Sequence, residues 1–118
     1  MSVKIEGNKI TMTRGDTLIA EVFITDSHGD PYYPESGDSI RFALKRPIMT
    51  SGNKEYKDRE PLIVKTIPIN TMILQIDPVD TKPLDFGKYV YDIELTYANG
   101  NVDTFITTAP FELSPEVH

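Results

Sequence analysis

The sequence predicts an all-β domain, and three observations lead to this fold class. Short runs in which apolar and polar residues alternate recur about every ten residues along the chain. Gly, Pro, Asn and Asp fill the intervals between these runs, where the chain must reverse. No stretch sustains a helical period over three turns. With 118 residues and 39% apolar content, the chain suits one hydrophobic core, so we expect a single domain over residues 1–118.

The first long strand signal covers residues 18–25. Leu18, Ala20, Val22 and Ile24 share one side of the predicted strand, and Ile19, Glu21, Phe23 and Thr25 share the other. Both sides are partly apolar, which predicts a strand covered on both faces. Residues 26–31, with the letters DSHGDP, then predict a turn, because Gly tolerates positive φ and Asp side chains hydrogen-bond to turn backbone.

The clearest alternation follows in residues 39–45. Ile40, Phe42 and Leu44 are predicted to point inward, and Arg41, Ala43 and Lys45 outward. Residues 47–61 form a long polar connection, which at such a length is either functional or mobile. Residues 62–67 and 72–77 predict two further strands, and the Pro and Asn between them indicate a hairpin or a connection that switches sheets.

The last third of the chain predicts one helical turn and a long hairpin. Asp77 is the expected cap of the turn, with Pro78 as its first residue. In the next strand one face carries Tyr89, Tyr91, Ile93 and Leu95, and the opposite face carries Val90, Asp92, Glu94 and Thr96. Asn99-Gly100 favours a type I′ turn. The partner strand, residues 102–113, is expected to break or bulge at Pro110, which has no N–H to donate.

These elements amount to about seven or eight strands, which predicts an immunoglobulin-like antiparallel β-sandwich, with a small barrel as the competing fold. The pattern formed by Asp85, Gly87 and Tyr89 favours the sandwich, because it resembles a tyrosine corner, in which the hydroxyl bonds back to the preceding backbone. Tyr89 is then structural. A protein-kinase interpretation of the letters DFG at residues 85–87 would also need a Gly-rich loop and a catalytic Asp followed by an Asn, and neither is present.

Composition excludes several classes of function. A formal net charge of −6 argues against nucleic acid as a partner, since binding phosphate backbones needs clustered Lys and Arg. No apolar run approaches the roughly 20 residues that cross a bilayer, and the first residues lack the order of a secretory signal, so we expect no membrane partner and no signal peptide. The absence of Cys excludes disulfides, a thiolate nucleophile and a cysteine-ligated metal.

No residue set predicts catalysis, a metal or a cofactor. His28 falls in a turn and His118 at the terminus, so they do not form a site, and no nucleophile and base can be paired. Asp26 and Asp30 lack the spacing of a calcium loop. Arg14, Gly15 and Asp16 spell an integrin-ligand tripeptide, but Gly and Asp before a strand more often make a turn.

Tyr32 and Tyr33 are adjacent aromatic residues between prolines. They are candidates for a platform that stacks on sugars or docks a protein, since tyrosine combines a rigid apolar ring with a polar tip. The alternative interpretation, which we weight more heavily, is that one of the two rings closes the open end of the sandwich.

A resemblance narrows these expectations. The segments TRGDTLIAEVFITDSHGDPY, GKYVYDIELTYANGNV and FELSPEV, in this order, resemble the immunoglobulin-like domains of virion proteins of tailed phages and prophages. The similarity to the N-terminal domain of phage baseplate upper proteins runs over nearly the whole chain, and residues 47–61 are an insert relative to it. The resemblance implies a non-catalytic structural or assembly protein of a tail, a baseplate or a virion accessory, made in the bacterial cytoplasm.

The expected partners are other virion proteins, with a homo-oligomer as a further arrangement. The candidate contact residues are Tyr32, Tyr33, Met49 and Tyr56, chosen from two polar loops. The alternative function is a β-sandwich module that binds carbohydrate or a cell surface, for which Tyr32 and Tyr33 would supply the stacking surface.

Overall fold

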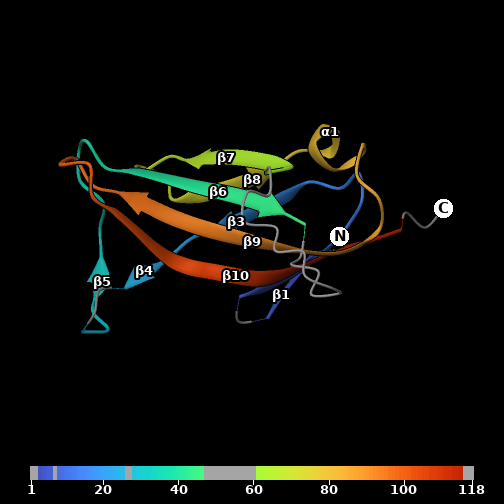
Figure 1. The fold of residues 1–118 in the computed structure, drawn as a ribbon, viewed down its shortest axis with the longest axis horizontal. Coiled ribbons are helices and arrows are strands. Elements are labelled where there is room, and N and C mark those ends of the chain that lie inside the picture. Colours follow the sequence, from blue (N-terminus) through green and yellow to red (C-terminus); the bar gives the residue numbers. More distant parts are fainter. Residues whose placement is uncertain (1–2, 7, 26–27, 47–60, 116–118) are drawn as a thin grey trace, which may run out of the picture.

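The computed structural model describes residues 3–6, 8–25, 28–46 and 61–115, and within them the fold is all-β apart from one helical turn (Figure 1). The all-β prediction is therefore confirmed. The elements are β1 (Val3–Glu6), β2 (Lys9–Thr13), β3 (Leu18–Glu21), β4 (Ile24–Thr25), β5 (Pro31–Tyr32), β6 (Ser39–Lys45), β7 (Ile63–Ile67), β8 (Ile73–Ile76), α1 (Pro78–Thr81), β9 (Gly87–Thr96) and β10 (Val102–Ser114). These ten strands exceed the expected seven or eight, partly because the predicted strand over residues 18–25 divides into β3 and β4.

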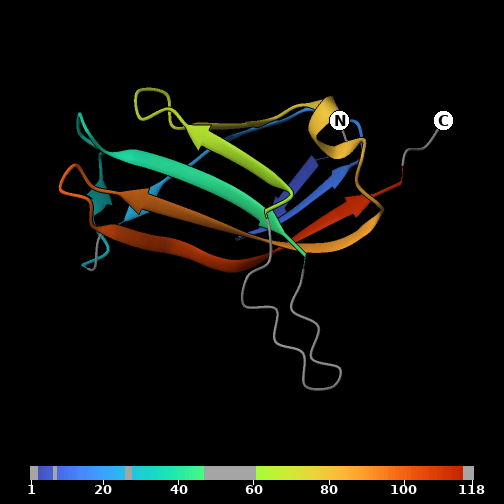
Figure 2. The ribbon, with the colours of Figure 1, turned by 45° about the horizontal axis from the view of Figure 1, so that its top comes forward.

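The main sheet has six strands in the order β1-β2-β10-β9-β6-β7. Its neighbours are antiparallel except for β2 and β10, which run parallel from Ile10 opposite Phe111 to Thr13 opposite Ser114. The long strands β9 and β10 run side by side along the longest axis of the molecule and curve along it (Figures 1 and 2).

Two short sheets complete the fold. One pairs β3 with β8, from Leu18 opposite Ile76 to Glu21 opposite Ile73, and the other pairs β4 with β5. In Figure 1 the pair of β3 and β8 lies behind the main sheet. Because β7 pairs with β6 in the main sheet and β8 pairs with β3, the connection between β7 and β8 switches sheets, which decides between the two predicted alternatives.

One hydrophobic core joins the main sheet to the pair of β3 and β8. Its buried residues include Met12, Leu18, Ile40, Phe42, Leu44, Ile67, Leu74, Ile76, Leu95, Phe111 and Leu113. The predicted inward face of β6 and the predicted apolar face of β9 are both confirmed. Ala43 was expected to point to solvent and is only 4% exposed. In the sheet it lies between Val64 of β7 and Asp92 of β9, and both of these cross-strand neighbours carry larger side chains than alanine.

The predicted two-sided coverage of residues 18–25 is wrong. Leu18 and Ile24 are buried, whereas Ile19 is 64% exposed and Phe23 is 77% exposed. The alternation was interpreted correctly, but among the described residues no further layer covers the outer face of β3 and β8. This side of the molecule therefore presents apolar groups to solvent.

The helical turn and the final hairpin refine the remaining predictions. Asp77 caps α1, and its backbone N–H donates to Asp80 Oδ2 at 2.8 Å, as the expected helical turn requires.

The predicted type I′ turn between β9 and β10 is wrong. Gly100 has a φ of 91°, but Asn99 is not in the positive-φ region that a type I′ turn requires at both central residues. The Gly100 N–H donates to the carbonyl of Tyr97 at 2.8 Å. The turn therefore has its central residues at Ala98 and Asn99, followed by Gly in the left-handed region.

The irregularity expected at Pro110 lies further upstream. The register of β10 against β9 shifts between Thr104 and Ile106 and again between Ile106 and Ala109, whereas Pro110 stays in register opposite Val90. The parallel register with β2 begins only at Phe111. Pro110 thus sits where β10 acquires its second neighbour, a position that tolerates a residue without an N–H.

Candidate interaction surfaces

Tyr32 and Tyr33 have different environments although they are adjacent in the sequence. The Tyr32 hydroxyl donates to Asp38 Oδ2 at 2.7 Å, its ring meets the ring of Tyr97 edge-on at 6.0 Å, and the side chain packs against the core. Tyr33 is 78% exposed. Tyr32 therefore occupies the end of the core, and Tyr33 is the ring that a partner can reach.

Asp38 ties together the two loops at this end of the molecule. Its Oδ2 accepts from the Glu35 N–H at 3.0 Å and from the Tyr32 hydroxyl, and its Oδ1 accepts from the Ala98 N–H at 3.2 Å. The Glu35 N–H and the Tyr32 hydroxyl hold the pKa of Asp38 below its usual value. The hydrogen bond to this carboxylate, together with desolvation, raises the pKa of Tyr32 to about 12.

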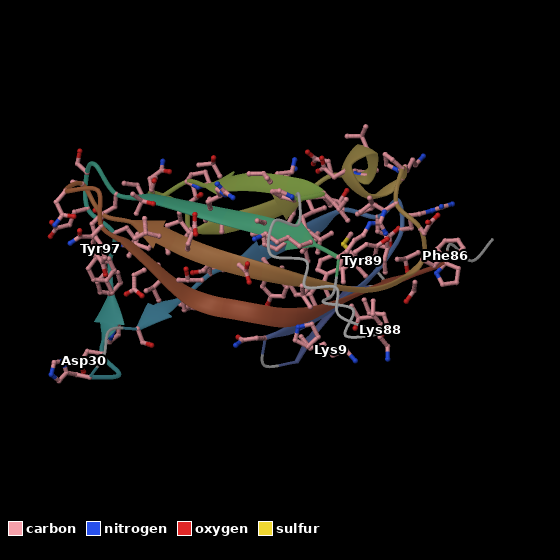
Figure 3. All side chains as sticks on the ribbon, in the orientation of Figure 1. Lys9, Asp30, Phe86, Lys88, Tyr89 and Tyr97 are labelled. Atoms are coloured by element: carbon pink, nitrogen blue, oxygen red, sulfur yellow. The ribbon has the colours of Figure 1, made fainter. Side chains whose placement is uncertain are left out.

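The two loops also approach closely at Gly37. Its φ is +97°, and a Cβ built there would lie 2.8 Å from the Cβ of Ala98. Only glycine combines this backbone conformation with so close a neighbour. The loop that follows Tyr33 is thereby held against the hairpin between β9 and β10, and Figure 3 shows Tyr97 at this end, close to β5.

Other candidate residues fall outside the described part of the chain. Met49 and Tyr56, the other two expected contacts, lie in residues 47–60, and Asp26 of the acidic pair lies outside as well. Among the residues that the structure describes, no group of three or more His, Asp or Glu side chains could hold a metal ion.

The tyrosine-corner residues lie at the other end of the long axis, where Figure 3 shows Tyr89 and Phe86. The Tyr89 hydroxyl donates to the carbonyl of Asp85 at 2.6 Å, and burial raises the pKa of Tyr89. Gly87 begins β9 with a φ of +139°, a conformation that side chains rarely adopt. These three residues fix the bend between α1 and β9, which is a structural task.

The tripeptide of Arg14, Gly15 and Asp16 packs against the same corner. The Arg14 guanidinium lies over the Phe86 ring, Gly15 N donates to Thr81 Oγ1 at 2.9 Å, and Asp16 N donates to the Thr13 carbonyl at 3.1 Å. The tripeptide forms a turn, as predicted from the position of Gly and Asp before a strand. Its arginine and glycine are engaged with the α1 region.

Sequence reasoning missed an apolar groove between β3 and β10. It has a volume of about 240 Å³, and its apolar wall includes Ile10, Val22, Phe23, Leu74, Ile93 and Ile106. Asn8 and Tyr91 also line it, and Glu21 is the charged residue of its lining. The Tyr91 hydroxyl donates to the carbonyl of Asn8, and burial raises the pKa of Tyr91 to about 12. Because five strands or their flanks supply the wall, no local sequence signal could have located it.

Two strand edges flank this groove. Within the described ranges β3 pairs only with β8, and β10 acquires β2 as a neighbour only over Phe111–Ser114. One edge of β3 and one edge of the first half of β10 therefore carry backbone groups with no partner strand. Such edges are templates for pairing with another chain.

Two comparisons with known proteins found no match. No protein-family model matches the chain. No curated protein matches it either. Within the residues that the structure describes, no helix has the length and apolar character needed to cross a membrane.

Proposed function

We propose that this chain is a non-catalytic structural or assembly protein of a tailed phage or prophage particle, and that it acts through protein–protein interfaces. The observation that carries the proposal is the side of the molecule around β3. There, Ile19 and Phe23 are exposed, an apolar groove is open, and two strand edges lack a neighbour among the described residues. Apolar surface beside an unpaired strand edge is suited to contacts with other proteins.

We further propose that the fold is an immunoglobulin-like sandwich. In that fold one sheet contains the antiparallel strands C, F and G and the other contains B and E. In this proposal the strands β6, β9 and β10 correspond to C, F and G, and β3 and β8 correspond to B and E; the neighbour order of β6, β9 and β10 supports the assignment. The hydroxyl of Tyr89, near the start of the penultimate strand, bonds back to Asp85, as the tyrosine corner of this fold requires.

The end of the molecule that carries Tyr33 supplies a second contact candidate. Asp38 joins the loop after Tyr33 to the hairpin between β9 and β10, so that the exposed ring stands on a fixed base. An exposed aromatic ring on a rigid base loses little conformational entropy when it binds. In this proposal the partners at both surfaces are other virion proteins.

The proposal is tested on particles from a host that carries this gene. Particles are purified by density gradient from the parent strain and from a strain in which the gene is deleted, and their proteins are quantified by mass spectrometry. We expect the chain in a fixed ratio to the major tail protein, and we expect the deletion to yield particles that lack one component in electron micrographs. Absence of the chain from complete, infectious particles would contradict the proposal.

The alternative, a carbohydrate-binding or cell-surface-binding module, is favoured by the exposure of Tyr33 alone. Tyr32 does not complete a two-ring platform, because its hydroxyl is bonded to Asp38 and its ring contacts Tyr97. A glycan array read with the original chain and with Tyr33→Ala tests this function. Binding that the substitution abolishes would favour the alternative.

A further inference from the structure

We propose that Asn99 is a site of spontaneous chemical modification, at which the backbone nitrogen of Gly100 displaces the side-chain amide and water converts the product to aspartate and isoaspartate. Three observations carry the inference: the geometry of the turn, the exposure of its tip, and its position beside the hydrogen bond through which Asp38 holds the hairpin between β9 and β10. The inference goes beyond the proposed function and holds whether or not the chain belongs to a phage particle.

The turn holds the two reacting groups together. The Oδ1 atom of Asn99 accepts from the Asn101 N–H at 2.9 Å, which folds the side-chain amide over the peptide group between Asn99 and Gly100. The carbon Cγ, which carries Oδ1, is thereby kept beside the Gly100 nitrogen that attacks it. The same hydrogen bond draws electron density from the amide carbonyl and stabilises the negative charge that develops on Oδ1 during the attack.

The tip of the turn is open to solvent and to the reaction. Asn99, Gly100 and Asn101 are all exposed, and a Cβ built at Gly100 would meet no atom within 4 Å. Because glycine has no side chain, nothing on Gly100 hinders the approach of the amide to its nitrogen. The Gly100 N–H donates to the Tyr97 carbonyl at 2.8 Å, and this bond has to open first. It lies at an exposed hairpin tip, where local opening costs little free energy.

The reaction needs only water as a co-reactant. The Gly100 nitrogen forms a bond to Asn99 Cγ, the bond between Cγ and Nδ2 breaks, and Nδ2 leaves as ammonia with the proton that the Gly100 nitrogen gives up. The product is a cyclic imide. Water then opens the imide at Cγ, which leaves aspartate, or at the main-chain carbonyl carbon, which leaves isoaspartate. The net change is one water consumed and one ammonia released, with no oxidation or reduction.

The modification acts on the connection between the two loops at this end of the molecule. Both products place a carboxylate next to Ala98, whose N–H donates to Asp38 Oδ1 at 3.2 Å. Like charges in one small region repel each other, and isoaspartate also adds one carbon to the backbone of the turn. We therefore expect the modification to loosen the hairpin from the loop that follows Tyr33, in a fraction of molecules that grows with the age of the protein.

Mass spectrometry of the full chain tests the reaction. The folded chain is incubated at physiological temperature in mildly alkaline buffer made with ¹⁸O-labelled water, and it is then digested in ordinary water. Asn70 supplies a control within the same molecule, because it is also exposed and in a turn but is followed by Thr71, whose branched side chain crowds the attacking nitrogen. We expect Asn99 to be modified at least tenfold faster than Asn70, with one ¹⁸O atom in each product.

Two substitutions separate the reaction from its consequence. Gly100→Ala places a Cβ beside the attacking nitrogen and should slow the modification of Asn99 several-fold, with circular dichroism as the check that the variant is folded. Asn99→Asp installs the product carboxylate directly and should have a lower urea midpoint than Asn99→Ser, which keeps an uncharged oxygen at this position. In the Asp38→Asn background the midpoints of these two variants should coincide.

Four outcomes overturn the proposal. They are an Asn99 that stays unmodified or reacts no faster than Asn70, products without ¹⁸O, a folded Gly100→Ala chain that reacts at the original rate, and equal midpoints of Asn99→Asp and Asn99→Ser. The first three contradict the reaction, and the fourth contradicts its effect on the two loops. If Gly100→Ala does not fold, the comparison of Asn99 with Asn70 in the original chain decides.

Discussion

The guanidinium of Arg14 lies over the ring of Phe86, 4.6 Å from its centroid. This contact joins two tripeptides that each suggest a function in isolation, residues 14–16 with the letters RGD and residues 85–87 with the letters DFG. Arg14 also donates to the Leu84 carbonyl at 3.4 Å. The two tripeptides meet in one corner, between the turn that leads into β3 and the bend that leads into β9, where both serve the fold.

The Arg14–Phe86 contact should be measurable as a coupling energy. In a double-mutant cycle, Arg14→Gln removes the cation and Phe86→Leu removes the π face, while each keeps an extended or apolar side chain. Because Phe86 is 49% exposed, we expect a coupling of about 0.5–1 kcal/mol in the free energy of unfolding by urea. A coupling of zero within error would mean that the two side chains are merely adjacent.

The hydroxyl of Tyr89 is expected to stabilise the bend before β9. Tyr89→Phe removes the bond to the Asp85 carbonyl and leaves the buried ring in place, so we expect a loss of about 0.5–1.5 kcal/mol in the free energy of unfolding. Tyr33→Phe is the matched control, because it deletes the same atom from an exposed side chain and should change stability by less than about 0.5 kcal/mol. Equal effects of the two substitutions would argue against the tyrosine corner as a stabilising element.

The close approach of Gly37 to Ala98 predicts a large difference between two glycine substitutions. Gly37 and Gly100 have similar φ values, +97° and +91°, but a Cβ has open space at Gly100 and would lie 2.8 Å from Ala98 Cβ at Gly37. Gly100→Ala should therefore cost about 1–2 kcal/mol from backbone strain alone. Gly37→Ala should cost about 1–3 kcal/mol more from the clash.

Thermal or urea unfolding of both variants measures this difference. Adding Ala98→Gly to Gly37→Ala removes the opposing methyl group and should recover most of the extra loss. If the second substitution recovers nothing, the two loops are able to separate without cost, and the rigid base assigned to Tyr33 is wrong.

Local sequence signals were sufficient where neighbours along the chain decide the structure. The inward face of β6, the tyrosine-bearing face of β9 and the cap of α1 at Asp77 followed from alternation and from the preference of Asp and Pro for the start of a helix. Tyr89 was assigned its structural role from a pattern of five residues. In each case the partners lie within a few residues or repeat with the period of the strand.

The signals were insufficient where distant residues decide. Alternation placed Phe23 and Leu18 on opposite sides of the predicted strand, but it could not reveal that the side with Phe23 would lack a covering layer among the described residues. The turn at Asn99-Gly100 departs from type I′. In this turn the Ala98 N–H donates to the carboxylate of Asp38, which lies 60 residues earlier in the chain. The groove is built from residues of several strands, so it exists only once the sheets have assembled.

The bonds of Asp38 predict how stability depends on pH. Its pKa in the folded chain is lowered from the ordinary value of 3.8, first by the Glu35 N–H and then by the Tyr32 hydroxyl. A lowered pKa means that the folded state prefers the carboxylate, so the stabilisation is fully present above the unfolded pKa and is lost as the pH falls through the folded pKa. Asp38→Asn should therefore destabilise the chain at pH 7 and make progressively less difference in acid.

Urea midpoints of the original chain and of Asp38→Asn between pH 7 and pH 2 measure this effect, with Asp103→Asn as a control that removes an exposed carboxylate elsewhere.

On the alkaline side the pH dependence of stability has the opposite sign, because the pKa of Tyr32 is raised to about 12, mainly by its hydrogen bond to Asp38. The neutral hydroxyl stabilises the fold below pH 10, and this contribution is lost as the pH rises through 12. In Asp38→Asn the pKa of Tyr32 should fall toward its ordinary value, which NMR of ¹³C-labelled tyrosine detects. A Tyr32 pKa that does not change, together with a midpoint difference that is the same at pH 7 and pH 2, would show that Asp38 does not hold the two loops together through its charge.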